Sequence, residues 1–232
     1  MNIAVYCGSN PGRNDHFAQA ARDLGIWIAV HGHALVYGGS SVGLMGVLSS
    51  NVLAAGGNAY GVEPRFFIDA GVAQHDLTEL VVVDTMSERK AKMIELADAF
   101  VALPGGVGTL EEISEIMSCV RLGLDVGECF FLNIDGFYNP LIELLHGMEQ
   151  QGFIERGDLE RFHFLESVEQ LTRCLDRAER TPLAARATAA ELAELRAEVS
   201  RESQAELEAE RAAFYAPLQP DWAGASEAEP HQ

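Results

Sequence analysis

The sequence predicts an α/β protein with a doubly wound parallel sheet, helices on both faces and a helical extension at the C-terminus. Short apolar, β-branched runs alternate with longer amphipathic segments, which is the order of a parallel sheet with crossover helices. Three of these runs end in a glycine turn, at Gly8, at Gly38-Gly39 and at Gly105-Gly106. Such turns meet at the carboxyl edge of a parallel sheet. We therefore expect a Rossmann-like sheet of about six or seven strands.

Each expected element follows from a local pattern. Apolar runs between turn residues predict strands, and apolar residues at helical spacing predict helices. Asp15 is placed to cap the first helix, and the apolar run at 80–83 predicts a strand buried on both faces. In order, we expect strands at 2–6, 34–37, 59–62, 80–83, 97–103 and 129–133, and helices at 15–28, 44–55, 86–97, directly after the glycine turn at 105–108, and at 139–151.

The stretch Pro104-Gly105-Gly106-Val107-Gly108-Thr109 joins a buried strand to an amphipathic segment. A strand, a tight glycine turn and a helix N-terminus bring unpaired backbone N–H groups and the positive end of a helix dipole to one point. The glycines let the backbone approach a ligand that a Cβ atom would block, and Thr109 adds a hydroxyl donor. A phosphate group is the natural ligand of this turn.

The helix after this turn carries three acids in different positions. Glu112 lies beside the apolar stripe of the helix, where a carboxylate can meet a ligand held by the turn. Glu111 and Glu115 point nearer to solvent, and an acid such as Glu111 near a helix start commonly serves the helix dipole. The apolar residues expected to face the core are Ile113, Ile116, Met117 and Val120.

Composition argues against several classes of function. The net charge of −19 repels polyanions, so we expect no nucleic-acid partner. No run approaches the roughly 18 apolar residues of a membrane span, and the N-terminus lacks the basic region of a signal peptide. The four cysteines show no CxxC pair and the seven histidines no HExxH pattern, so we expect no metal and reduced thiols in a cytoplasmic protein.

Two blocks of the sequence resemble a known family. Pro104 to Glu112 matches the signature PGGxGTxxE, and Met86-Ser87-Glu88-Arg89-Lys90 is close to MHxRK. Both blocks, at this separation, resemble the LOG ("lonely guy") family, which is often labelled lysine-decarboxylase-like. The resemblance covers about residues 2–175. Further matches are Tyr6-Cys7-Gly8-Ser9, Val36-Tyr37-Gly38-Gly39, Gly43-Leu44-Met45-Gly46 and Gly136-Phe137-Tyr138.

The resemblance implies a homodimeric phosphoribohydrolase that needs no cofactor. Such an enzyme cleaves the N-glycosidic bond of a nucleoside 5′-monophosphate, for example AMP or a cytokinin-like or modified-base nucleotide, and releases the base and ribose 5-phosphate. Arg89 and Glu112 are the implied catalytic residues, and their individual roles stay open. The implied substrate-binding residues are Ser9, Gly38, Gly39, Gly43, Met86, Lys90, Gly105, Gly106, Val107, Gly108 and Thr109.

Some positions depart from the family pattern, and they leave the identity of the released base open. The third glycine of the second turn is Ser40, and the histidine of the arginine block is Ser87. The family's Trp-x-Gln is replaced by Cys119-Val120-Arg121, and its GVIP by Gly61-Val62-Glu63-Pro64.

Three other interpretations compete with the phosphoribohydrolase. A nicotinamide-dependent dehydrogenase is suggested by Gly38-Gly39 with Glu63 downstream, but no GxGxxG motif is present. Decarboxylation through pyridoxal phosphate needs a Schiff-base lysine, and the two lysines, Lys90 and Lys92, lie in no supporting motif. A non-catalytic nucleotide- or cofactor-binding carrier on the same fold stays the main alternative. Such a carrier needs the glycine turn but not both Arg89 and Glu112. An arginine such as Arg89 is commonly just a solvated charge on the surface, and Met86 fits core packing as well as it fits ligand binding.

After about Arg177 the composition shifts to Ala, Glu and Arg. Residues 184–214 favour a helix, which could extend a subunit interface, and residues 217–232 have the composition of a disordered tail. We therefore divide the chain into a nucleotide-binding catalytic domain at 1–177 and an acidic helical extension with a disordered tail at 178–232.

Overall fold

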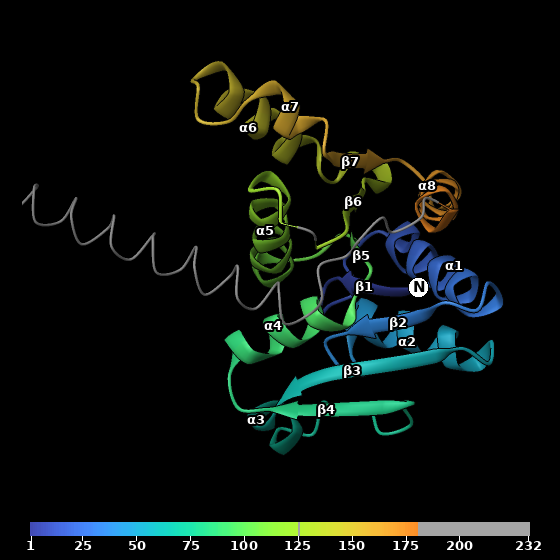
Figure 1. The fold of residues 1–232 in the computed structure, drawn as a ribbon. Coiled ribbons are helices and arrows are strands. Elements are labelled where there is room, and N and C mark those ends of the chain that lie inside the picture. Colours follow the sequence, from blue (N-terminus) through green and yellow to red (C-terminus); the bar gives the residue numbers. More distant parts are fainter. Residues whose placement is uncertain (125, 181–232) are drawn as a thin grey trace, which may run out of the picture. The chain divides into compact units, whose positions relative to one another are not determined.

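The computed structural model describes residues 1–124 and 126–180, and these residues fold around one parallel sheet. The sheet has seven strands in the order β4-β3-β2-β1-β5-β6-β7, shown in Figure 1. This confirms the predicted fold class. The strands are β1 (Asn2–Tyr6), β2 (Ala34–Tyr37), β3 (Asn58–Pro64), β4 (Glu79–Val83), β5 (Ala99–Ala102), β6 (Glu128–Leu132) and β7 (Phe162–Leu165).

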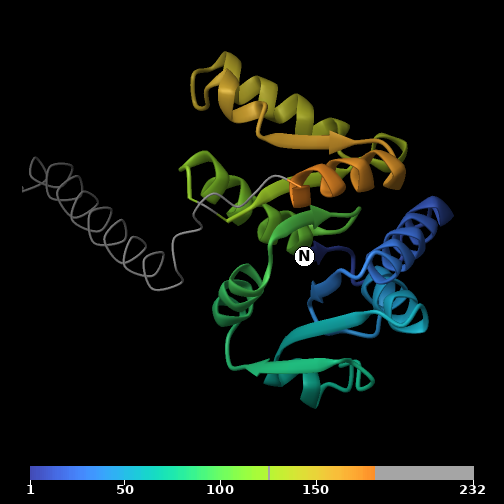
Figure 2. The same cartoon turned by 45° about the vertical axis from the view of Figure 1, so that its right-hand side comes forward.

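Helices cover both faces of the sheet, as Figures 1 and 2 show together. Side chains alternate along each strand, so Ile3 and Val5 face one hydrophobic cluster while Ala4 and Tyr6 face the other. The first cluster includes residues of α1 (Asp15–Val30), α2 (Gly43–Ala54) and α8 (Val168–Arg180); the second includes residues of α4 (Met86–Leu96), α5 (Val107–Arg121) and α6 (Asn139–Gln150). The short elements are α3 (Arg65–Asp69), η1 (Ile134–Gly136) and α7 (Arg156–Leu159).

Two local expectations are wrong. Asn14, not Asp15, caps α1: its backbone is extended and its side chain accepts a hydrogen bond from the His16 amide at 3.0 Å. The strand at 80–83 is not buried on both faces, because β4 is an edge strand and Val82 is 42% exposed. The pattern of β4 resembles that of a central strand, but a sequence pattern does not reveal which strand lies at the edge.

The domain contains elements that the sequence pattern did not predict, namely α3 between β3 and β4, and η1, α7, β7 and α8 after β6. The expected domain boundary at residue 177 falls inside α8, and the predicted helix at 184–214 and tail at 217–232 lie outside the described residues. None of the described helices is long and apolar enough to cross a membrane.

Candidate functional site

The site forms where the strand order reverses. β1 and β5 are neighbours in the centre of the sheet, and the chain winds outward from them in both directions, which opens a crevice at their carboxyl ends. The turns meet there as predicted: the Gly8 amide donates to the Pro104 carbonyl at 3.2 Å, and the Leu44 amide at the start of α2 donates to the Gly8 carbonyl at 3.0 Å. A hollow of about 220 Å³ lies in this crevice, lined by Gly8, Ser9, Asn10, Pro11, Gly12, Phe17, Leu44, Pro104, Gly105, Gly106 and Phe137.

The turn after β5 presents backbone donors to this crevice. Gly106 precedes α5, no side chain caps the helix, and Gly106, Val107 and Gly108 are exposed. The first amides of the helix have no partner within it, so they are available to an anion. Gly105 must lack a side chain, since a Cβ atom there would lie 2.2 Å from Thr109 Oγ1. That close packing buries Thr109 under the turn.

The second turn is held close to the first by its glycines. Gly43 has a φ of +60°, and a Cβ atom on it would lie 2.4 Å from the Ser9 carbonyl oxygen. Gly39 also has a positive φ, +83°. The lack of a side chain at Gly43 therefore lets the start of α2 approach Ser9, which lines the hollow.

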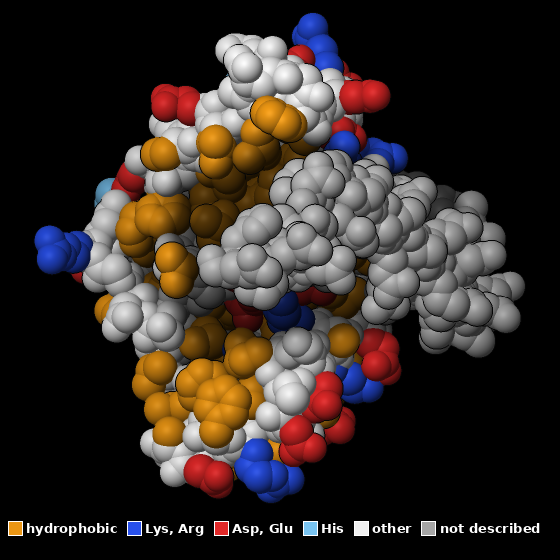
Figure 3. All heavy atoms as spheres, turned by 90° about the vertical axis from the view of Figure 1, so that its left-hand side faces the viewer, with side chains coloured by type: hydrophobic (Ala, Val, Ile, Leu, Met, Phe, Trp, Pro, Cys, Tyr) orange, Lys and Arg blue, Asp and Glu red, His pale blue; other side chains and the backbone are white. Residues whose placement is uncertain are grey.

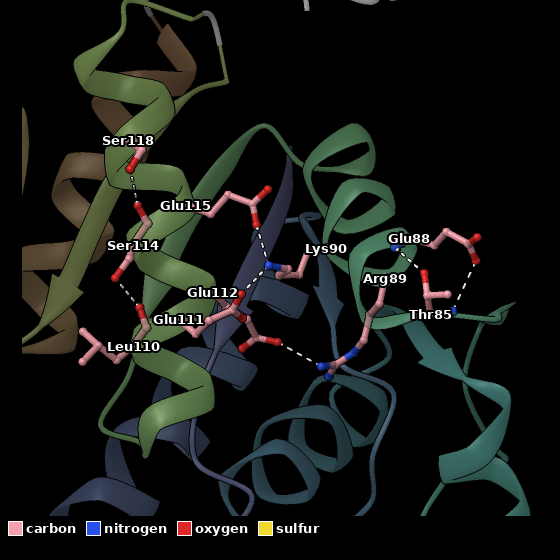
Figure 4. Close-up of polar contacts among 10 residues, drawn as sticks. All are labelled: Thr85, Glu88, Arg89, Lys90, Leu110, Glu111, Glu112, Ser114, Glu115 and Ser118. Carbon is pink, nitrogen blue, oxygen red and sulfur yellow. Dashed lines mark hydrogen bonds and ion pairs between the residues drawn. The ribbon is translucent and has the colours of Figure 1, made fainter. Parts of the chain in front are cut away.

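Arg89 and Glu112 form a buried ion pair between α4 and α5 (Figure 4). The Nη1 atom of Arg89 donates to Glu112 Oε1 at 2.9 Å, and its Nε donates to the Val62 carbonyl at 3.0 Å. Both residues are 8% exposed. Gly38 makes room for the guanidinium group, because a Cβ atom at Gly38 would lie 1.9 Å from Arg89 Nη2.

The start of α4 fixes the direction of Arg89. Thr85 and Glu88 form a capping box: the Thr85 hydroxyl accepts from the Glu88 amide at 3.1 Å, and the Glu88 carboxylate accepts from the Thr85 amide at 3.3 Å. Met86, the first residue of the helix, is 37% exposed and is not a core residue. Arg89 therefore leaves the first turn of a well-defined helix and crosses the ends of β2 and β3.

Burial controls the electrostatics of this pair. Burial raises the pKa of the Glu112 carboxyl, and the charge of Arg89 partly opposes the rise. Burial also raises the pKa of the neighbouring Cys7 thiol, which keeps that sulfur neutral and unsuited to nucleophilic attack. Within residues 1–124 and 126–180, no three His, Cys, Asp or Glu side chains are arranged as metal ligands.

Lys90 takes a different direction from Arg89. Its Nζ pairs with Glu111 and, at 3.0 Å, with Glu115, both on the outer side of α5 (Figure 4). The hydrogen bonds to Glu111 and Glu115 raise the pKa of Lys90. The structure therefore places Lys90 in a clamp between α4 and α5, not in the glycine crevice.

On the face that carries α4 and α5, Figure 3 shows acidic and basic side chains in a hollow between two areas of hydrophobic side chains. A second groove, of about 450 Å³, borders the glycine turn after β5 on the side of α6. Phe137 lines this groove as well as the first hollow. The sequence indicated Phe137 only as part of the matched segment Gly136-Phe137-Tyr138. The pattern also did not single out Glu63 as buried, although its place in Gly61-Val62-Glu63-Pro64 marked it as unusual.

Comparisons with known proteins agree with this architecture. A family model described as "Possible lysine decarboxylase" matches residues 45–175. A cytokinin riboside 5′-monophosphate phosphoribohydrolase from Rhodococcoides fascians is 46% identical over 66% of this chain and 78% of its own length. A phosphoribohydrolase of the same description from Arabidopsis thaliana is 37% identical over 75% of this chain and 76% of its own length.

The fold also occurs in solved structures of lower identity. The molybdenum cofactor binding protein from the phototrophic bacterium Rippkaea orientalis superposes with a TM-score of 0.60 at 20% identity, over 76% of this chain and 95% of that protein. At this identity the likeness concerns the fold.

Proposed function

The chain belongs to the LOG family, whose model is described as possible lysine decarboxylase, and we propose that it hydrolyses the N-glycosidic bond of a nucleoside 5′-monophosphate. The products are a free base and ribose 5-phosphate. The observation that carries the proposal is the buried Arg89–Glu112 pair beside a turn with free amides, at the point where the strand order reverses.

In this proposal the glycine turn binds the substrate, and the Arg89–Glu112 pair promotes cleavage of the glycosidic bond. The amides of residues 106–109 and the α5 dipole hold the 5′-phosphate, and binding energy at this remote group positions the ribose for cleavage. Glu112 faces the ribose, where its negative charge stabilises the oxocarbenium-like transition state and orients the attacking water. Arg89 holds Glu112 in place and adds positive charge beside the anionic substrate. The C1′–N bond breaks, a C1′–O bond forms, and a proton from water ends on the base.

The lysines do not fit pyridoxal phosphate chemistry. Lys90 is bound to two carboxylates that raise its pKa, and Lys92 pairs with Glu95 at 2.7 Å. A Schiff-base lysine needs a neutral amine and therefore a lowered pKa. The decarboxylase description of the family accordingly finds no support in these two side chains.

A panel of nucleoside 5′-monophosphates, assayed for released base by chromatography, tests the reaction. We expect cleavage of at least one nucleotide and little action on the matching nucleoside, because the nucleoside lacks the phosphate that the turn holds. Tight binding of several nucleotides without cleavage of any would contradict the enzyme and favour a non-catalytic carrier.

We also propose a homodimer in the cytoplasm, with a catalytic domain at 1–177 and the residues from 178 onward as an extension. The dimer is supported by the family resemblance rather than by a contact in the structure. Light scattering at micromolar concentration should give twice the chain mass of 25.1 kDa, and a monomer mass would reject it.

A further inference from the structure

Glu63 is a buried acid at the rim of the site. It follows Val62, whose carbonyl accepts the Arg89 Nε hydrogen bond, and lies near the carboxyl end of β3. The residue is 1% exposed, and its Oε2 atom has no hydrogen-bond partner among residues 1–124 and 126–180. Because successive side chains of a strand alternate, Glu63 points away from the α4 face that Val62 packs against. Its carboxyl group instead packs against Gly39, where a Cβ atom would lie 3.3 Å from Glu63 Oε2.

The positive charge of Arg89 therefore acts on two buried carboxyl groups. Glu112 contacts Arg89 directly, whereas Glu63 interacts with the Arg89 charge across the end of the strand. With both acids ionised, the buried cluster carries an excess negative charge, which is costly in a medium of low polarity. Burial accordingly raises the pKa of Glu63 to about 6, with the Arg89 charge opposing the rise. On the neighbouring strand β2, burial raises the pKa of Tyr37 and keeps it neutral, and the charge of Glu63 acts in the same direction.

We propose that Glu63 is a positioning residue that acts through Arg89: its ionised form weakens the pull of Arg89 on the anionic nucleotide, and its protonated form strengthens it. The inference rests on the proposed function for its kinetic test but not for its binding test. The physical reason is electrostatic, because a negative charge beside Arg89 lowers the positive potential that a phosphate-bearing ligand experiences. Coupling of this kind is reciprocal, so a bound nucleotide also favours protonation of Glu63.

Glu63→Gln removes the titration and keeps the shape of the side chain. Glu79→Gln, an exposed acid on the neighbouring strand β4, is the matched control. The kinetic measurement is KM for the nucleotide cleaved best, from pH 5 to pH 8, in the wild type and both variants. The substrate phosphate titrates in the same range, but the ratio of wild type to variant cancels that contribution.

We expect the KM of the wild type, divided by the KM of Glu63→Gln, to be near one at pH 5. The quotient should rise about fivefold by pH 8, which is at the low end of the usual coupling factors between two sites. The rise should be centred near pH 6, where Glu63 ionises. The corresponding quotient for kcat should change less with pH than the quotient for KM. For the control Glu79→Gln, the KM quotient should not change with pH. A ratio that is constant with pH, whatever its value, means that Glu63 serves packing and overturns the proposal.

Calorimetric titration of AMP in two buffers of different ionisation enthalpy, near pH 6.5, tests the same point without catalysis. Wild type should take up more protons on binding than Glu63→Gln. Equal proton uptake overturns the Glu63 proposal even if AMP is cleaved, and unequal uptake supports it even if no nucleotide is cleaved. Absence of binding to wild type, at every pH, of AMP and of every other nucleotide in the panel overturns both proposals. If Glu63→Gln does not fold, Glu63→Ile, which restores the GVIP pattern of the family, replaces it in both measurements.

Discussion

Two consecutive cations of α4, Arg89 and Lys90, pair with acids of α5, and their surroundings differ in burial. Arg89 and Glu112 are each 8% exposed and meet beside the glycine crevice. Lys90 meets Glu111 and Glu115 on the outside, where those two acids are about half exposed. Neighbouring residues of similar charge therefore have different tasks: the buried pair is fixed in position and its charge is poorly screened, whereas the outer cluster is screened by water. The difference lies in where the helix faces point and not in residue type.

The largest effect is expected when each cation, Arg89 or Lys90, is replaced by alanine. Arg89→Ala leaves Glu112 buried without its partner, which should lower the free energy of unfolding by about 3–5 kcal/mol and abolish base release. Lys90→Ala should cost below about 1 kcal/mol. Urea denaturation of both variants measures the difference. Equal losses would mean that the two pairs contribute alike and that burial is not decisive.

Replacing the Glu112 carboxylate with an amide removes the charge and keeps the shape, so this change separates binding from chemistry. Glu112→Gln should bind AMP about as well as wild type yet lose about 10²–10³-fold in kcat, the usual effect of losing one electrostatic contact to a transition state. Its neighbour provides the control, since Glu111→Gln should retain turnover. Base release and equilibrium binding are measured on the same preparations. Full activity in Glu112→Gln would leave the reaction standing and reject this residue as its carboxylate.

The raised pKa of Glu112 also gives the sign of a pH effect. The reaction needs the carboxylate, and a raised pKa means that this form is lost at a higher pH than for an ordinary glutamate as the solution is acidified. We expect kcat of the wild type to fall on the acid side of the profile. A profile that stays flat down to pH 4 would contradict the assignment.

Glu63, a buried acid outside α5, should show a smaller effect, and it extends the comparison to an acid on the sheet. Its pKa in the folded protein, about 6, is above the ordinary value of 4.5, so the folded state binds the extra proton. Its contribution to stability is most favourable below pH 4.5 and is lost as the pH rises through 6, by about 2 kcal/mol in all. Glu63→Gln should therefore stabilise the protein more at pH 7.5 than at pH 4.5. Thermal unfolding at both values measures this, with Glu79→Gln as the control that should show no such difference.

The smallest expected effect concerns the turn, not the pairs. A Cβ atom added at Gly106 would meet no protein atom within 4 Å apart from its chain neighbours, so Gly106→Val should fold normally. The valine side chain would then occupy the approach to the amides. AMP affinity should fall about tenfold, or 1.4 kcal/mol. Circular dichroism verifies the fold. Unchanged affinity would move the phosphate site away from this turn.

The sequence by itself determined the order of β1 to β6 and of the long helices between them, together with the residues of the glycine turn after β5. Apolar runs, glycine turns and helical spacing are local patterns, so β1 to β6 and α5 follow from neighbouring residues. The position of Glu112 beside the apolar stripe of α5 also follows from helical spacing, whereas its burial is a finding of the structure.

Tertiary structure decided the remaining features, because they depend on contacts between distant segments. Arg89 and Glu112 are 23 residues apart, and only packing of α4 against the sheet beside α5 brings their side chains to 2.9 Å. The separate direction of Lys90, the edge position of β4 and the burial of Glu63 have the same origin. A residue's type fixes its charge, but the strand order of the sheet fixes how much water surrounds that charge, and hence what the charge does.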